Sequence, residues 1–362
     1  MKIRISETSD APMWDAYVHD HSRAVLYHLF GWQNIIRRTY GHKTYYLLAI
    51  RNNHSIAGIL PLVHIRHLIF GNTLTSIPFF DMGGILADDA GTEKALLAEA
   101  IRLGRKLRVD NIELRHTEPL SCWSDSGQKD HFPNPETRQA TFATRSHKVL
   151  MRLALPESPE VLMKSFKAKL RSQIKRPLKA GLHTKIGGSE LLDDFYDVFL
   201  INMRDLGSPV HSKAFMKNVL RTFPGKASIV MVYKEHQPAA CSFVVGFRDT
   251  LENPWASALR QYSRLSPNML LYWAMLEHAC EHAYGHFDFG RSTPGEGTYK
   301  FKAQWGAKPA PLNWHNVFLR GEPGDIRTPE TSKFDDAIQY WQKLPVTATK
   351  IMGPMIRKYI RN

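Results

Sequence analysis

The chain has 362 residues but only three cysteines, which are too few for a disulfide framework. An odd number of cysteines is typical of a protein from a reducing compartment. Cys241 and Cys280 lie within apolar runs, which predicts buried, unreactive thiols, and Cys122 has no activating partner near it in the sequence. The sequence therefore gives no reason to expect a cysteine nucleophile.

Long apolar runs are also lacking. No uninterrupted stretch approaches the ~18 apolar residues that a helix needs to cross a bilayer. The first residues, MKIRISE, do not contain the apolar core of a secretory signal. Apolar residues make up 43% of the chain and charged residues 23%, which is typical of a globular protein. We therefore expect a cytoplasmic chain that is long enough for two domains.

Acidic residues are scarce: 34 Asp and Glu stand against 48 Lys and Arg, for a net charge of +14. Between Glu160 and Glu190 there is no acidic residue at all. Such an imbalance favours an anionic partner, namely nucleic acid, a nucleotide-linked substrate or a membrane surface, over a surface that is basic for solubility alone. The residues predicted to bind this anion are Lys167, Lys169, Arg171, Lys175 and Arg176.

One succession of apolar runs occurs twice along the chain. Two runs rich in β-branched and aromatic residues are joined by a short polar turn, which predicts a β-hairpin. A segment with helical spacing and a short strand follow each hairpin. The segments are 45–50, 56–63, 94–107 and 111–115 in the first copy and 229–233, 239–245, 269–283 and 286–289 in the second.

This order is the core of an N-acetyltransferase (GNAT) fold. Its recurrence predicts an α+β chain of two tandem GNAT-like domains, each a mixed β-sheet flanked by helices. The polar segment 121–145, which includes glycine and prolines, is interpreted as a linker. The expected domains are therefore residues 1–145 and 146–320, the second with the main cleft, followed by a helical tail over 321–362.

The second domain is expected to open with a strand over 148–155 and then a long helix. Ser158 is the predicted N-cap and Pro159 the first helical residue. Pro177 is predicted to end or kink this helix. Apolar residues recur every four positions along it, which predicts one buried face with the basic residues around the rest of the circumference: Leu162, Phe166, Leu170 and Ile174.

The segment 287–307 is the richest in residues that could carry chemistry. A strand runs into a glycine-rich loop, whose backbone can approach a ligand closely. Arg291 can bind a phosphate or carboxylate through two parallel hydrogen bonds. Lys300 and Lys302 alternate with Tyr299 and Phe301, which on a strand would place charge on one face and aromatic rings on the other. A capped loop with surface lysines is an equally weighted interpretation.

A glycine-containing loop before a helix cradles the pyrophosphate of acyl-CoA in GNAT acetyltransferases. At the analogous position, residues 260–268, the sequence RQYSRLSPN has no glycine. The chain is therefore expected to have a GNAT-like fold without a well-formed loop for the pyrophosphate of CoA.

Several short motifs, spread over most of residues 1–320, resemble proteins of the FemAB family, in particular the branch associated with PEP-CTERM and exosortase exopolysaccharide systems. The resemblance implies transfer of an aminoacyl group from aminoacyl-tRNA to an amine of a cell-wall precursor. The motifs are YGHK (40–43), GILPL (58–62), IPFFDMGG (77–84), KLR (169–171), LSPN (265–268) and the segment 288–306, which closes with FKAQWG.

One motif departs from the family's pattern, so the resemblance does not identify the acceptor. His28–Trp32 is similar to the family's Gln-x-x-x-Trp segment, which is followed by a substrate-binding lysine. Here Ile36 stands at that place, with Arg37 next to it. A peptidoglycan precursor is the family's usual acceptor, and another nucleotide- or lipid-linked envelope or exopolysaccharide precursor is the alternative.

No Ser-His-Asp or Cys-His arrangement is present, and a bound amine can attack an activated ester directly if a base accepts its proton. Asp288 is the first candidate for this base and Asp81 the second. A buried carboxylate that bonds loop N–H groups is an equally good interpretation of Asp288. The residues expected to bind donor or substrate are Arg291, Tyr299, Lys300, Lys302, Trp305, Tyr262, Asn268 and Arg260.

Neither a bound cofactor nor a metal ion is expected: aminoacyl-tRNA or acyl-CoA would be a co-substrate, and His278, Cys280 and His282 do not form a complete ligand set. The basic carboxyl end could contact a membrane surface, although packing against the body is favoured. Two other functions compete with the aminoacyltransferase. They are an N-acyltransferase that uses acyl-CoA or an acyl carrier, and a non-catalytic module that binds tRNA or an envelope precursor.

Overall fold

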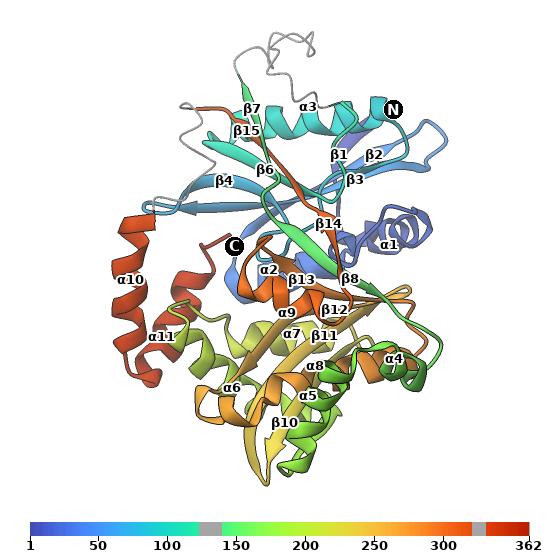
Figure 1. Ribbon diagram of the computed structural model, residues 1–362. Coiled ribbons are helices and arrows are strands. Elements are labelled where there is room, and N and C mark those ends of the chain that lie inside the picture. Colours follow the sequence, from blue (N-terminus) through green and yellow to red (C-terminus); the bar gives the residue numbers. More distant parts are fainter. Residues whose placement is uncertain (123–139, 321–330, 362) are drawn as a thin grey trace. The chain divides into compact units, whose positions relative to one another are not determined.

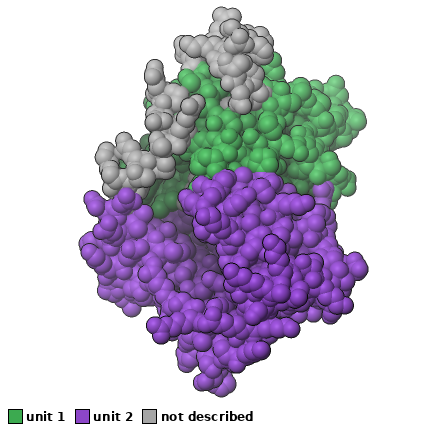
Figure 2. Space-filling view, viewed as in Figure 1, with its two compact units in different colours: residues 1–148, 311–329, 359–362 green, residues 149–310, 330–358 purple. Residues whose placement is uncertain are grey.

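The computed structural model describes residues 1–122, 140–320 and 331–361. It divides into two compact units, shown in Figure 2. Unit 1 comprises residues 1–148, 311–329 and 359–362, and unit 2 comprises residues 149–310 and 330–358. Each unit is a mixed β-sheet with helices (Figure 1), so the expected α+β class is confirmed. Residues 311–320, which were expected in the second domain, belong instead to unit 1.

The sheet of unit 1 has, among the described residues, the strand order β1-β2-β3-β4-β6-β15-β7, with β5 beside β3. Strands β4 and β6 are parallel, and the other neighbours are antiparallel. The strands are β1 (Lys2–Ile5), β2 (Lys43–Ile50), β3 (Ile56–His67), β4 (Gly71–Ser76), β5 (Leu86–Ala87), β6 (Asn111–His116), β7 (Thr141–Arg145) and β15 (Asn313–Phe318). The helices are α1 (Ala11–Asp20), α2 (Gly31–Tyr40) and α3 (Ala90–Lys106).

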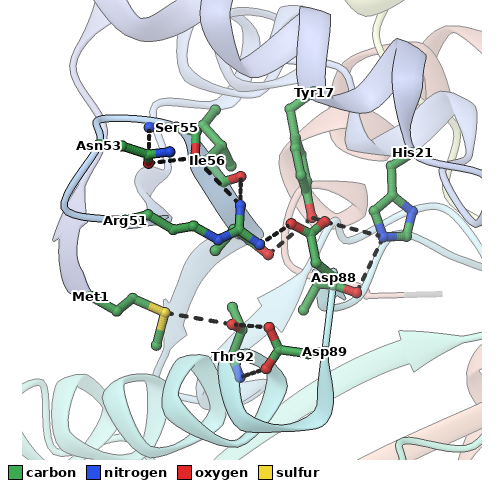
Figure 3. A network of polar contacts seen from close by, with 12 residues as sticks. Met1, Tyr17, His21, Arg51, Asn53, Ser55, Ile56, Asp88, Asp89 and Thr92 are labelled. Atoms are coloured by element: carbon green, nitrogen blue, oxygen red, sulfur yellow. Dashed lines mark hydrogen bonds and ion pairs between the residues drawn. The ribbon is translucent and has the colours of Figure 1, made fainter.

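A polar network ties the first hairpin of unit 1 to α1 (Figure 3). Asp88 accepts hydrogen bonds from the Tyr17 hydroxyl at 2.8 Å and from Arg51 Nη2 at 2.6 Å. The next residue, Asp89, caps α3 by accepting from the backbone N–H of Thr92 at 2.8 Å. The Asp89 contact satisfies a helix-end N–H group that has no partner inside the helix.

The sheet of unit 2 has, among the described residues, the order β14-β8-β13-β12-β11-β10-β9. The strands are β8 (Val149–Ala154), β9 (Leu182–Gly187), β10 (Ala227–Lys234), β11 (Gln237–Phe247), β12 (Thr250–Ala258), β13 (His286–Ser292) and β14 (Lys308–Pro311). The helices are α4 (Pro159–Ser165), α5 (Ala168–Lys179), α6 (Leu192–Asp205), α7 (Lys213–Thr222), α8 (Pro267–Glu281), α9 (Gly297–Ala303), α10 (Thr331–Lys343) and α11 (Val346–Arg357).

Both faces of the unit 2 sheet are buried. Val230 and Val232 of β10 join a core cluster with residues of α5 and α8. On the other face Phe243 of β11 packs against Phe195 of α6, with ring centroids 5.7 Å apart. Side chains alternate between the faces of a strand, so covering both faces requires the nearly continuous apolar runs seen in the sequence.

Two local expectations were wrong. The long helix is two helices, because Phe166 and Lys167 have extended ψ angles of 147° and 148° between α4 and α5. Of the two outcomes predicted for Pro177, the helix end is not observed, because Pro177 lies inside α5, which continues to Lys179. Thr141–Arg145, expected in the linker, is a strand that pairs with β15; the linker residues 123–139 lie outside the described residues. The four apolar residues of the expected stripe are nonetheless all buried in one core.

Candidate functional site

Strands β12 and β13 of unit 2 are parallel neighbours that pair over a short length. Within the described chain their register covers Thr250↔His286, Leu251↔Phe287 and Glu252↔Asp288. Beyond this point β12 stays paired with β11 up to Ala258, and β13 stays paired with β8 up to Ser292. We call the opening after Glu252 and Asp288 the strand fork.

A bulge in β13 lies at the fork. The pairing of β13 with β8 shifts between Asp288 and Arg291, and Gly290 has a φ of +76°, a conformation that glycine adopts readily. Asp288, which is 1% exposed, accepts a hydrogen bond from the Gly290 N–H at 2.7 Å. Its other oxygen accepts from Arg152 Nε at 3.0 Å. Asp288 therefore holds the bulge in shape, as in the second interpretation that the sequence allowed.

Lys302 brings a buried positive charge to the same bulge. Its side chain comes from α9, and Nζ donates to the carbonyl oxygens of Gly290 at 3.0 Å and Arg291 at 2.9 Å. A Cβ atom at Gly290 would lie 3.4 Å from the Asn253 carbonyl oxygen and 4.0 Å from Lys302 Nζ. The ammonium group, the bulge and β12 thus converge at the fork.

The expected alternation of Lys300 and Lys302 along a strand was wrong. Residues 297–303 form the helix α9, so the two lysines lie on different sides of it. Lys302 is 8% exposed, whereas Lys300 is on the surface. Tyr299 is half-buried and Trp305 is fully buried in the core, where it packs against Phe166 at 5.6 Å between ring centroids.

Tyr272 and Asn253 also belong to this site, and sequence reasoning missed both. The Tyr272 ring stacks on Phe289 of β13, with centroids 5.6 Å apart. The Asn253 side chain hydrogen-bonds the Tyr272 hydroxyl and accepts a hydrogen bond from Ser242 Oγ at 2.8 Å. Burial raises the pKa of Tyr272 to about 12, so its hydroxyl keeps its proton at neutral pH. No strand was predicted over Thr250–Ala258, so no sequence signal pointed to Asn253.

The other predicted residues are spread over several places. Arg291 is half-buried on β13, opposite Leu150 of β8. Arg260 is on the surface and donates to the backbone oxygen of Asp205 at 2.8 Å. Tyr262 lies in the short 3-10 helix 260–265, and Asn268 is exposed in the first turn of α8. Asp81 lies in unit 1, where its backbone oxygen accepts from Trp314 Nε1 at 2.8 Å.

The glycine-free turn before α8 uses its backbone N–H groups internally. The N–H groups of Tyr262 and Ser266 donate to carbonyl oxygens of the turn at 3.1 and 3.0 Å, and that of Met269, in the first turn of α8, donates to the Ser266 oxygen at 3.0 Å. Ser266 has a φ of +56° and ends the turn. These three amide groups are therefore not directed at a ligand phosphate.

The basic residues expected to bind an anion surround α5. Lys167, Lys169, Lys175 and Arg176 are exposed. Arg171 is half-buried and donates to the Phe166 backbone oxygen at 2.5 Å, so it also joins α4 to α5. The helix thus presents a positive surface opposite its buried stripe.

Comparison with known proteins agrees with this geometry. Residues 164–303, from α4 to α9, match the family model of the acetyltransferase (GNAT) domain. Unit 2 thus carries a GNAT domain. No curated protein sequence matches the chain.

Two solved structures show the same fold over nearly the whole chain. FemX is 14% identical, with a TM-score of 0.64 over 86% of this chain and 97% of its own. A tandem GNAT protein from the clavulanic acid biosynthesis pathway is also 14% identical, with a TM-score of 0.56 over 90% and 99%. At these identities the likeness concerns the fold, which is the tandem GNAT fold. None of the described helices is long and apolar enough to span a membrane.

Proposed function

We propose that the chain is a cytoplasmic N-acyltransferase that moves an aminoacyl group from aminoacyl-tRNA to an amine of a cell-envelope precursor, at the strand fork of unit 2. The observation that carries the proposal is the convergence of the Lys302 ammonium, the Gly290 bulge and the Tyr272–Asn253 pair where β12 and β13 part. The GNAT domain match and the fold shared with FemX support it.

The fork offers what transfer from an ester requires. The acceptor amine attacks the ester carbonyl, a C–N bond forms, and the C–O bond to the ribose breaks. The Lys302 charge stabilises the oxyanion that develops on the carbonyl. Tyr272 can give its proton to the departing ribose oxygen, and the tyrosinate then takes up the proton that the amine loses. Asp288 contributes indirectly, because it holds the Gly290 bulge against which Lys302 is placed.

The choice of a tRNA donor rests on two features of unit 2, namely the cations of α5 and the turn before α8. The exposed cations of α5 suit a polyanion that makes several phosphate contacts. The turn before α8 has no glycine, and two of its backbone N–H groups and one at the start of α8 are bonded internally, which disfavours a pyrophosphate cradle for CoA. Aminoacyl-tRNA and nucleotide-linked precursors both occur in the cytoplasm, so the reaction is placed there.

The acceptor is inferred from the FemAB resemblance of the motifs. We propose a nucleotide- or lipid-linked precursor with a free amine, of the peptidoglycan or the exopolysaccharide kind. The place of the family's substrate-binding lysine is taken by Ile36, which is fully buried on α2, so any acceptor contact made there must come from other side chains.

An acyltransferase that uses acyl-CoA is the second candidate. The family model that matches residues 164–303 is that of an acetyltransferase, and the fold is shared with a tandem GNAT protein. This candidate needs the same fork but a different site for the donor's phosphates.

The test is a matched donor screen with the purified chain. Charged tRNAs and acyl-CoAs are supplied separately with amine-bearing envelope precursors, and the acceptor is analysed by mass spectrometry. An aminoacyl mass increase that appears with charged tRNA alone supports the proposal, whereas an increase with acyl-CoA alone selects the second candidate. Tyr272→Phe keeps the stacked ring and should slow transfer about 100-fold. No transfer from any donor, with tRNA still bound, would identify a non-catalytic binding module.

A further inference from the structure

The carboxyl end of α8 carries a cluster of metal-ligating side chains apart from the strand fork. We propose that His278, Glu281 and His282 form a binding site for a divalent transition-metal ion of the Zn²⁺ type. One ligand atom from each of the three side chains lies within 4.8 Å of the other two. The inference does not depend on the proposed acyl transfer.

The helix itself brings the ligands together. Residues three and four positions apart lie on the same side of a helix, so His278 is next to both Glu281 and His282. The two imidazole rings are 3.9 Å apart between centroids. Glu281 and His282 are exposed and His278 is half-buried, so small side-chain rotations can close the ligand set around an ion.

A hydrogen bond orients one of the three side chains. His282 Nδ1 lies 2.9 Å from the backbone oxygen of His278. A carbonyl oxygen can only accept, so Nδ1 is the donor, and in the neutral ring Nε2 is the nitrogen with the lone pair that can bind an ion. Histidines that bind metals are held in the same way, with the other ring nitrogen donating to a carbonyl or carboxylate.

The surroundings of the cluster are acidic, although the whole chain has a net charge of +14. Glu277 interacts electrostatically with Glu281 and with Glu160, which precedes α8 in sequence but lies close to it in space. A cation placed among these carboxylates would relieve their mutual repulsion.

The donor set selects the class of metal. Two imidazoles and one carboxylate suit Zn²⁺, and also Cu²⁺ or Ni²⁺, better than Mg²⁺ or Ca²⁺, which prefer oxygen ligands. Water would complete the coordination. Cys280, which the sequence placed between the two histidines, is 5% exposed and is not in the cluster.

The ion would fix the turn that connects α8 to β13. Ala283, directly after the site, has a φ of +55°, and β13 starts at His286. A metal ion at this place would stabilise the helix end and the start of the strand that carries Asp288. The site is thus assigned a stabilising role.

The experiment is a calorimetric titration of the metal-free full-length chain with ZnCl₂. We expect one saturable equivalent that His278→Gln and His282→Gln each weaken at least tenfold, and a higher melting temperature with Zn²⁺ in the unaltered chain. His236→Gln, an exposed histidine between β10 and β11, is the control and should leave this equivalent unchanged. The proposal is overturned if no saturable equivalent is seen, or if the double variant His278→Gln/His282→Gln, folded by circular dichroism, still binds it.

Discussion

At the scale of single residues, the strand fork depends on one buried ammonium group. Lys302 and Lys300 lie two residues apart in α9, yet Lys302 is 8% exposed and donates to two carbonyl oxygens, whereas Lys300 is on the surface. A buried charge persists only where such partners offset the loss of water. Comparing variants of Lys302 and Lys300 therefore distinguishes the effect of a positive charge at the site from that of a positive charge on the surface.

We expect Lys302→Met to reduce the rate of acyl transfer by about 100- to 1,000-fold, which is typical of losing one oxyanion-stabilising group. The Gly290 and Arg291 carbonyls lose a donor, so the free energy of unfolding should fall by about 1–3 kcal/mol. Lys300→Met makes the same change of charge and should alter neither quantity appreciably. Steady-state kinetics and thermal unfolding of both variants provide the measurement. Equal rates for the two variants would contradict the role assigned to Lys302.

Gly290→Ala tests whether the space beside the bulge must stay free of a side chain. The new methyl group would lie 3.4 Å from the Asn253 carbonyl oxygen and 4.0 Å from Lys302 Nζ, and a φ of +76° strains alanine by about 1–2 kcal/mol. Gly225 has a similar φ of +70°, and a Cβ atom there would meet no neighbour within 4 Å. Gly225→Ala should therefore strain the backbone by a similar amount outside the fork. We expect both variants to lose similar stability in chemical denaturation and only Gly290→Ala to lose transfer activity. Parallel losses of activity would mean that backbone strain alone is the cause.

At the scale of elements, we propose the basic surface of α5 as the binding surface for a polyanion. Reversing three exposed charges, Lys167→Glu, Lys169→Glu and Lys175→Glu, should weaken tRNA binding strongly, because each lost phosphate contact removes counterion release. The slope of log affinity against log salt should become shallower by about 2–3. The measurement is filter binding across a range of salt concentrations.

A matched triple variant controls for net charge. Lys217→Glu, Arg221→Glu and Lys226→Glu reverse three charges that are also exposed in unit 2, but on and after α7. If both triple variants weaken binding equally, the attraction belongs to the overall charge of the chain rather than to α5.

The elements themselves show what a sequence can predict. Both hairpins and the helices α3 and α8 were predicted, because their apolar spacing reflects burial along one local segment. Helix α9 was not, because charged and aromatic residues that alternate over four positions fit a strand as well as a short helix. The strand fork could not be foreseen either, since it depends on where pairing stops between β12 and β13, which are separated by α8. Tyr272 lies on the predicted helix α8, but its place at the fork depends on this same pairing of distant strands and was missed.

At the scale of the whole molecule, the chain passes repeatedly between its two units. Residues 330–358 belong to unit 2, and the final residues 359–362 belong to unit 1. In unit 1 the Arg361 backbone oxygen accepts from the Phe79 N–H at 2.8 Å and from Arg115 Nη2 at 3.2 Å. Phe79 has a φ of +79°, so the loop between β4 and β5 is held in a strained conformation that these contacts support.

A buried ion pair of unit 1 also involves Arg361. Glu113 is 2% exposed and accepts from Arg115 Nη2 at 2.6 Å, with Arg361 Nη1 at 3.7 Å from its other oxygen. Burial alone would raise the pKa of Glu113, but the charges of Arg115 and Arg361 outweigh it and hold the pKa below its usual value. The last residues of the chain thus stabilise a buried carboxylate on β6.

We expect a chain that ends at Lys358 to lose stability in unit 1 alone. Without Arg361, the Phe79 amide loses the Arg361 acceptor and the Glu113 carboxylate has one cation fewer, which should cost about 1–3 kcal/mol locally. Hydrogen exchange read by mass spectrometry should then be faster in peptides covering 77–83 and 111–116 and unchanged in those covering 227–247. Arg361→Ala keeps the backbone oxygen and removes the ion pair, so in this variant Phe79 should stay protected while 111–116 exchanges faster. Slow exchange at 77–83 in the shortened chain would show that the loop between β4 and β5 holds its strained conformation without the carboxyl-terminal residues.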